Sequence, residues 1–158
     1  MTASRRAVLT GLGAGTAILT LSGLGIALAP SEARAELPKM SVWKDPSCGC
    51  CGAWVDHVRA AGFQVDVRES TDMAAIKQVH QVPPQLQSCH TALVDGYVLE
   101  GHVPAEDVLR LIKERPAAKG LTVPGMPQGS PGMETGHKDA YDVILFGGEG
   151  GDKVFASH

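Results

Sequence analysis

Three of the chain's four cysteines lie in the stretch 48–51, which reads C-G-C-C, and the fourth, Cys89, is followed directly by His90. Three thiols so close together cannot all pair with one another, and a structural disulfide gains most when it joins distant residues. Two kinds of chemistry suit these residues better. Thiolates are the ligands that select a soft metal ion such as Cu(I). Cys48 and Cys51 also have the C-x-x-C spacing of redox-active dithiols.

Two other readings use the same cysteines. A strained local disulfide with one spare thiol would make the stretch purely structural. Zinc is usually held by paired C-x₂₋₄-C or C…H units in one tetrahedron, and the adjacent Cys50 and Cys51 are awkward for that arrangement. Vicinal thiolates can instead bridge several Cu(I) ions, which favours copper over zinc.

A helix is expected to position the cysteines. The pattern predicts a strand over 40–44, a break at 45–47 and a helix from the cysteines to about residue 61, whose apolar positions follow helical spacing. The cysteines therefore come at a helix N-terminus. Free N–H groups and the helix dipole stabilise a thiolate there, and the thiolate is both the nucleophile and the metal ligand.

The remaining elements follow the order of the thioredoxin fold. Strands are predicted over 63–67, 91–94 and 97–100. Helices are predicted over 73–79, capped by Ser70 or Thr71, and over 105–115, with Pro104 at the first helical position.

The order β-α-β-α-β-β-α has its C-x-x-C between the first strand and the first helix, as in thioredoxin-like proteins. Cys89 and His90 precede the third strand, where those proteins carry a cis-proline that faces the C-x-x-C. The fold would therefore bring Cys89 and His90 to the cysteine cluster.

The predicted fold class is α/β: a thioredoxin-like mixed sheet with flanking helices and a Gly/Pro/Met-rich C-terminal extension. We expect a metal-binding core over 36–116 and an extension over 117–158 that packs on it. The extension is read as loop to residue 135, followed by a strand over 141–146 and a hairpin partner over 153–155. Met126 and Met133 lie in its loop, where they are either metal ligands or packing residues. His102 has the same two readings, as a ligand or as a hydrogen-bonded structural histidine.

Residues 1–35 have the pattern of an export signal. Paired arginines at 5 and 6 precede an uncharged stretch over 7–29, and residues 33–35 form an A-x-A cleavage pattern. The arginines resemble a twin-arginine signal. The alternative is a retained anchor, because the stretch is long enough to span a bilayer. We expect cleavage before Glu36, no stable membrane span afterwards, and a periplasmic location, where thiols tend to be oxidised.

Composition limits the function classes. The chain has 158 residues, 44% of them hydrophobic and 20% charged, which suits a globular domain with a packed core. Its formal net charge of −3 argues against a general nucleic-acid binder. Phosphate-binding loops, G-x-S-x-G elbows and H-E-x-x-H motifs are absent from the sequence.

Five stretches together resemble the CopG-type copper-resistance family of exported, thioredoxin-like proteins. They read W-K-D-P-S-C-G-C-C-G at 43–52, S-C-H-T-A at 88–92, E-G-H-V-P at 100–104, G-L-T-V-P-G-M-P at 120–127 and G-S-P-G-M-E at 129–134. The resemblance covers most of 41–146. It implies bound copper and redox activity, with the family's C-x-C-C on Cys48, Cys50 and Cys51 and its C-H pair on Cys89 and His90.

Three functions remain open. The first is copper binding in copper resistance, with more than one Cu(I) held by Cys48, Cys50, Cys51 and Cys89 and with His90 beside them. Met126, Met133 and His102 are further candidate ligands. The second is a thiol–disulfide or copper-linked oxidoreductase that uses Cys48 and Cys51, and the third is a structural domain. The expected partners are copper ions and periplasmic copper-handling or thiol-redox proteins, with no nucleic acid.

Overall fold

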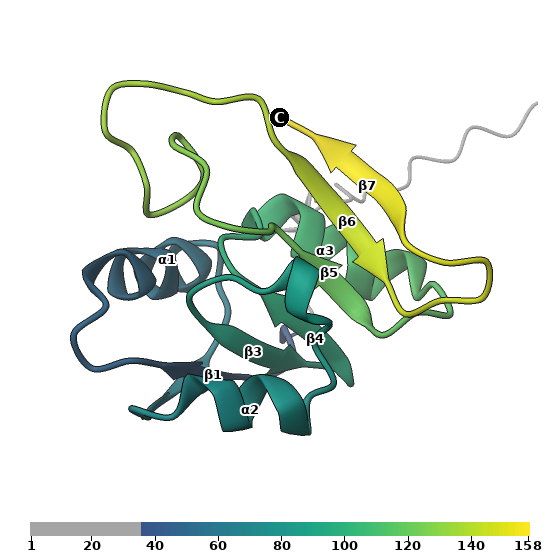
Figure 1. Cartoon of the computed structure of the whole chain (residues 1–158), viewed down its shortest axis with the longest axis horizontal. Helices are drawn as coiled ribbons and strands as arrows, with labels where there is room; N and C mark the ends of the chain where they lie inside the picture. Colours follow the sequence, from purple (N-terminus) through teal and green to yellow (C-terminus); the bar gives the residue numbers. More distant parts are fainter. Residues whose placement is uncertain (1–35) are drawn as a thin grey trace, which may run out of the picture. The chain divides into compact units, whose positions relative to one another are not determined.

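A seven-stranded mixed sheet forms the centre of the structure, a computed structural model that describes residues 36–158 (Figure 1). The first four strands are β1 (Met40–Lys44), β2 (Val65–Glu69), β3 (Thr91–Val94) and β4 (Tyr97–Glu100). The last three are β5 (Gly120–Thr122), β6 (Asp142–Phe146) and β7 (Lys153–Ser157). Their order across the sheet is β2-β1-β3-β4-β5-β6-β7. The pairs β1–β2 and β4–β5 are parallel, and the other neighbouring pairs are antiparallel.

Three α-helices flank the sheet: α1 (Gly49–Ala60), α2 (Met73–Val79) and α3 (Ala105–Glu114). A short 3₁₀ turn, η1 (Pro84–Leu86), follows α2. The predicted element order over the first seven elements is confirmed. The predicted first helical residues, Met73 and Ala105, are confirmed, but two predicted assignments at the helix N-termini are wrong. Asp72, rather than Ser70 or Thr71, caps α2 by accepting a hydrogen bond from the Ala75 N–H at 3.0 Å. Pro104 is the N-cap residue of α3, one position before the first helical residue.

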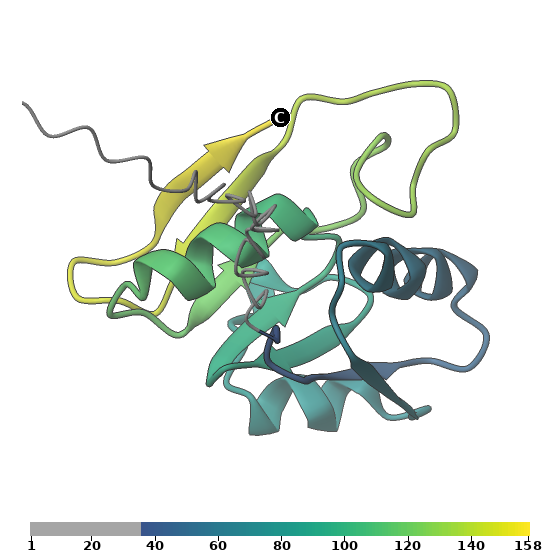
Figure 2. The same cartoon turned by 180° about the vertical axis from the view of Figure 1, so that it is seen from behind.

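The helices cover opposite faces of the sheet. Helices α1 and α3 lie on one face and α2 on the other, as the two opposite views show (Figures 1 and 2). The larger core packs between the sheet, α1 and α3, and Trp54 and Leu111 are fully buried in it. A smaller core around Val98 and Phe146 packs on the α2 side. Successive strand residues point to opposite faces, so β3, β4 and β6 contribute side chains to both cores.

The C-terminal part of the chain corrects the sequence prediction. Residues from 117 onward are not an extension packed on a finished core, because they supply three strands of the same sheet. The strand β5, predicted as loop, pairs with β4 on one side and with β6 on the other. The hairpin of β6 and β7 is confirmed and ends the sheet. The described residues, 36–158, belong to one compact unit.

The expected export signal lies outside the described residues. Within residues 36–158, none of the helices is long and apolar enough to cross a membrane.

Candidate metal centre

The cysteines of the C-x-C-C stretch occupy the first turn of α1. Cys48 is the N-cap residue, and its N–H donates to the Asp45 carbonyl at 3.0 Å. The Asp45 carboxylate accepts from the N–H and the hydroxyl of Ser47, and these hydrogen bonds lower the pKa of Asp45. A side chain that bonds to its own backbone two residues on forms a tight turn. This turn carries the chain from β1 into the helix, so the predicted placement at a helix N-terminus is confirmed.

The four sulfur atoms converge. The Sγ atoms of Cys48, Cys50, Cys51 and Cys89 all lie within 4.8 Å of one another. Cys48 and Cys51 form a disulfide, as predicted for oxidised protein, and Cys50 and Cys89 have free thiols. The Cys50 Sγ is 3.5 Å from the Cys48 Sγ. The cluster therefore combines one disulfide with two thiols beside it.

Two imidazoles extend the cluster on the Cys89 side. The Cys89 Sγ lies 3.3 Å from the Nδ1 of His90 and 2.9 Å from the Nε2 of His102. The Nδ1 of His102 is 2.7 Å from the carbonyl of Pro131, so it carries the proton and donates. The Nε2 lone pair of His102 therefore faces Cys89. The carbonyl of Pro131, in the loop between β5 and β6, selects this tautomer, as ligand histidines require.

His90 is fully buried against α1. Its ring lies 4.3 Å from the Trp54 ring, centroid to centroid, and the Trp54 indole N–H donates to the Val103 carbonyl at 2.9 Å. The His90 Nε2 is buried without a hydrogen-bond partner among the residues that the structure describes. Buried polar atoms are nearly always satisfied in folded proteins, and an exception indicates a partner such as a bound ion. His90 is therefore suited to act as a metal ligand.

Burial controls the protonation of this part of the site. It lowers the pKa of His90 well below its ordinary value, helped by the charges of His102 and of two nearby lysines, and it also lowers the pKa of His102. Both rings are therefore neutral at pH 7, which is the form that binds a metal ion. Burial and, secondarily, the charge of Cys50 raise the pKa of the Cys89 thiol to about 11. Cys89 must lose a proton to become a ligand, so metal binding at this position releases protons.

The two candidate methionines lie in the loop that connects β5 to β6. This loop extends towards α1 (Figure 1). Met126 is 52% exposed, and Met133 is half-buried one residue after Gly132. A Cβ added at Gly132 would lie 2.7 Å from the Cys50 carbonyl oxygen and 2.8 Å from the backbone nitrogen of Trp54. The loop backbone thus packs directly on the first turn of α1, next to the cysteines.

Replacing Gly132 with alanine tests this packing. Gly132 has a φ of +87°, and the clashing atoms belong to helix backbone that cannot rotate away. We expect a loss of about 1–3 kcal/mol from overpacking, added to about 1–2 kcal/mol for the left-handed backbone. Gly136 is the matched control, because its φ is +89° and an added Cβ would meet no described atom within 4 Å. Denaturant unfolding should show the larger loss for Gly132→Ala, and equal losses would contradict the packing.

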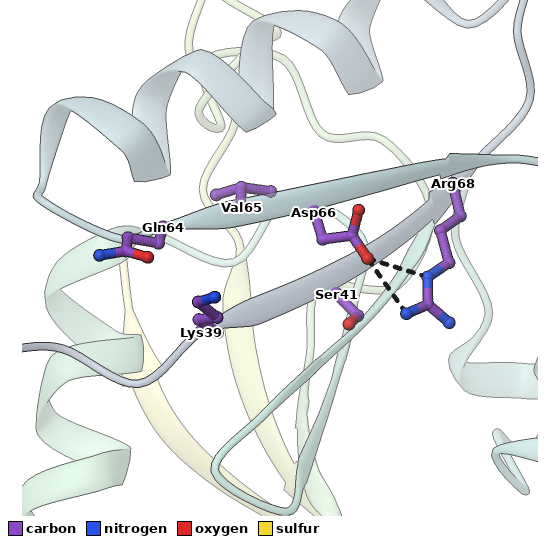
Figure 3. Close-up of a pocket in the computed structure, with 6 residues that line it drawn as sticks. All are labelled: Lys39, Ser41, Gln64, Val65, Asp66 and Arg68. Atoms are coloured by element: carbon purple, nitrogen blue, oxygen red, sulfur yellow. Dashed lines mark hydrogen bonds and ion pairs between the residues drawn. The ribbon is translucent and has the colours of Figure 1, made fainter.

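A second feature of the surface is a cavity of about 500 Å³ along β1 and β2. Its lining residues, drawn in Figure 3, are mostly polar: Lys39, Ser41, Gln64, Val65, Asp66 and Arg68. Arg68 and Asp66 are paired with each other at 3.0 Å. The cavity shares no residue with the cysteine and histidine cluster, so we assign the chemistry to the cluster.

Sequence reasoning missed several residues that support the site. His57 accepts a hydrogen bond from the Ala105 N–H at 3.0 Å and so ties α1 to the start of α3. The buried pair Lys77 and Glu100 was not identified, because lysine and glutamate in short elements are usually exposed. Pro131 was also missed, since its contact is a backbone carbonyl and leaves no signal in side-chain type.

These observations define a mixed α/β domain with a cluster of four cysteines and two histidines that is able to bind metal. A family described as "Protein of unknown function, DUF411" matches residues 86–133. Two solved structures of copper resistance protein CopG are similar over nearly their whole length. Form 2 is 45% identical with a TM-score of 0.74, and the alignment covers 78% of this chain and 99% of that chain. Form 1 is 44% identical with a TM-score of 0.72, covering 78% and 98%.

The chain belongs to the family of copper resistance protein CopG, and the resemblance seen in its sequence is confirmed. A search of curated proteins found no match.

Proposed function

We propose that this protein is an exported copper-binding protein of copper resistance, which holds Cu(I) on Cys48, Cys50, Cys51 and Cys89. The observation that carries the proposal is the approach of these four sulfur atoms to within 4.8 Å of one another. Thiolates are soft ligands that select Cu(I). The similarity to copper resistance protein CopG supports the same metal.

The donor set suits more than one copper ion. Four thiolates can bridge several Cu(I) ions, whereas separate tetrahedral sites would need more ligands. His90 and His102 adjoin Cys89 as neutral imidazoles, and the unpartnered Nε2 of His90 fits a ligand role. Met126 and Met133 are additional proposed ligands, because thioethers also select Cu(I) and their loop packs on the start of α1.

Loading requires reduction first. The disulfide between Cys48 and Cys51 must accept two electrons and two protons before both sulfurs can ionise and bind copper. A protein or small-molecule dithiol can supply them and is itself oxidised to a disulfide. A periplasmic thiol-redox protein is therefore one proposed partner, and a copper-handling protein that delivers or receives the ions is another.

A titration of the reduced protein tests the proposal. The protein is reduced, freed of metal and titrated anaerobically with Cu(I) against a competing chromophoric chelator, and copper per chain is measured. We expect more than one tightly bound Cu(I) per chain, with proton release as the thiols ionise. A variant with all four cysteines changed to serine is the control. Equal copper uptake by that variant would refute the site.

A second candidate function is thiol–disulfide exchange. The supporting observation is a free thiol, on Cys50, 3.5 Å from the disulfide sulfur of Cys48. Turnover separates copper binding from thiol–disulfide exchange. An oxidoreductase reduces a disulfide substrate or oxidises Cu(I) repeatedly, while a copper-binding protein acts once per site.

We also propose that the fold is thioredoxin-like, supported by the order β1-α1-β2-α2-β3-β4-α3 and by the cysteines between β1 and α1.

Export to the periplasm is proposed from the sequence of residues 1–35. The expected mature protein begins at Glu36, after the A-x-A pattern at 33–35. The intact mass of protein recovered from the periplasm of the bacterial host should equal that of residues 36–158. A membrane-bound species with the mass of the whole chain would favour the retained anchor instead.

A further inference from the structure

We propose that Glu100 is a positioning residue whose buried carboxylate holds Cys89 and His90 at the metal centre. The inference rests on the proposed copper site for its function, although the geometry concerns only this chain. Glu100 is the last residue of β4 and is fully buried. Among the described residues, its carboxylate has no hydrogen bond to Cys89 or His90. It contacts instead the two residues that flank them, Ser88 and Thr91.

The carboxylate bonds to both sides of the Cys89–His90 pair. Its Oε1 accepts from the Ser88 N–H at 2.7 Å, and its Oε2 accepts from the Thr91 hydroxyl at 2.6 Å. One rigid, planar group thus fixes the chain immediately before Cys89 and immediately after His90. Hydrogen bonds to an ionised acceptor are short and stronger than neutral ones, so this pair of bonds restrains both positions.

Burial raises the pKa of Glu100, and Lys77 acts against that effect and holds the carboxylate in place. Its ammonium group, also buried, donates to the Glu100 Oε1 at 2.5 Å and to the Thr91 hydroxyl at 3.3 Å. The Thr91 hydroxyl therefore accepts from the lysine and donates to the carboxylate, which satisfies every member of the network. We name the three side chains of Lys77, Thr91 and Glu100 the α2-side clamp.

The clamp and the candidate ligands lie on opposite faces of the sheet. Side chains alternate between the faces of a strand, so Thr91 and Glu100 lie on the α2 face while His90 packs on Trp54 of α1 on the other face. One backbone bond, from the Gly101 N–H to the His90 carbonyl at 2.9 Å, joins the same segments. The thiol and imidazole thus lie on the ligand face, and the charged network that sets their position lies behind them, away from any bound ion.

Burying a charged pair such as Lys77 and Glu100 costs desolvation free energy, and an apolar pair in its place would often leave the protein as stable. The segment that carries the two ligands, Gln87 to His90, lies between η1 and β3 and has no regular secondary structure. The carboxylate supplies the hydrogen bonds that hold this segment. Groups that orient metal ligands typically contribute about 10- to 100-fold to metal affinity. We expect an effect of that size from the clamp.

Three substitutions separate positioning from stability. Glu100→Gln removes the charge and leaves one acceptor oxygen where the carboxylate has two, so it cannot accept both bonds. Thr91→Val removes both hydrogen bonds of the hydroxyl, to Glu100 and from Lys77, while leaving the ion pair and the net charge intact. Thr91→Ser keeps the hydroxyl and should behave as the unmodified protein. Glu69→Gln is the matched control, because Glu69 also pairs with a lysine, Lys44 at 3.8 Å, but its side chain is 61% exposed.

The first measurement needs no copper. In oxidised protein the disulfide protects Cys48 and Cys51, so a short bis-alkylating reagent can couple only Cys50 and Cys89. Mass spectrometry should show efficient coupling in the unmodified protein, in Thr91→Ser and in Glu69→Gln. Coupling should fall severalfold in Glu100→Gln and Thr91→Val, while single alkylation continues. A purely structural role would lower the unfolding midpoint and leave coupling in the folded protein unchanged.

The second measurement is Cu(I) affinity by chelator competition in the reduced variants. We expect a loss of about 10- to 100-fold in Glu100→Gln and a smaller loss in Thr91→Val. The proposed role of the clamp is refuted if both variants show the coupling and the copper affinity of the unmodified protein. If Glu100→Gln does not fold, the result for Thr91→Val decides. If the unmodified protein binds no copper, the proposed function fails, and the coupling experiment still decides whether the clamp exists.

Discussion

Replacing Cys50 with serine is expected to remove most of the bound Cu(I) while the protein remains folded. Cys50 lies in the first turn of α1, is part exposed, and has no disulfide to lose. Its sulfur is 3.5 Å from that of Cys48 and within 4.8 Å of the other two. A thiolate in that position can bridge two ions, so its loss disrupts the cluster rather than one ligand bond. Serine is a harder donor that Cu(I) does not favour.

Cys89→Ser is the comparison for Cys50→Ser. Cys89 enters the cluster from the start of β3, and its replacement should lower the copper content less than replacement of Cys50. Both variants should unfold within about 0.5 kcal/mol of the unmodified protein, since neither side chain forms part of the hydrophobic core. Copper per chain after anaerobic loading is the measurement. Full copper content in Cys50→Ser would show that Cys50 is not a bridging ligand.

Replacing Gly120 with alanine is expected to have the largest effect on stability. An alanine Cβ would lie 1.7 Å from the Val98 carbonyl oxygen and 2.6 Å from its carbon, both in the backbone of the neighbouring strand. The clash can be relieved only by separating β5 from β4. We expect a loss of about 3 kcal/mol or more, above the usual range for overpacking, and a fall in the melting temperature of roughly 10 °C or more.

Gly52→Ala is the matched control for an added methyl group. Gly52 is inside α1, and a Cβ there would meet no described atom within 4 Å. Alanine is the better helix residue, so this variant should gain about 0.5–1 kcal/mol. Thermal unfolding of the two variants checks both predictions. Unchanged stability in Gly120→Ala would mean that β5 does not lie against β4, and the sheet would then lose its connection to β6 and β7.

The strand β5 could not be predicted from the sequence. It has three residues, Gly120–Thr122, which is too short to show a period-two pattern, and it begins with a glycine that usually indicates a loop. The sequence around it was therefore read as a loop-rich extension. The glycine is present for a tertiary reason, the close approach of two strands, which no local pattern contains.

The thiol cluster, in contrast, could be predicted. The C-G-C-C spacing, the C-H pair and the order of elements were sufficient to bring Cys89 and His90 to the start of α1, where the structure has them. What orients them could not be predicted. The carbonyl of Pro131 selects the His102 tautomer from 29 residues away, and Lys77 and Glu100 meet across the sheet. Such contacts depend on the packed fold, and a lysine or a glutamate in the sequence is ordinarily a surface residue.

X-ray absorption at the copper edge, combined with metal analysis, tests the central proposal most directly. The sample is the protein reduced, loaded with Cu(I) and purified without oxygen. The four converging sulfurs predict more than one Cu(I) per chain and a shell made mainly of sulfur neighbours, with nitrogen from the histidines as a minor contribution. A single copper ion per chain, or a shell dominated by oxygen, would contradict the proposed cluster.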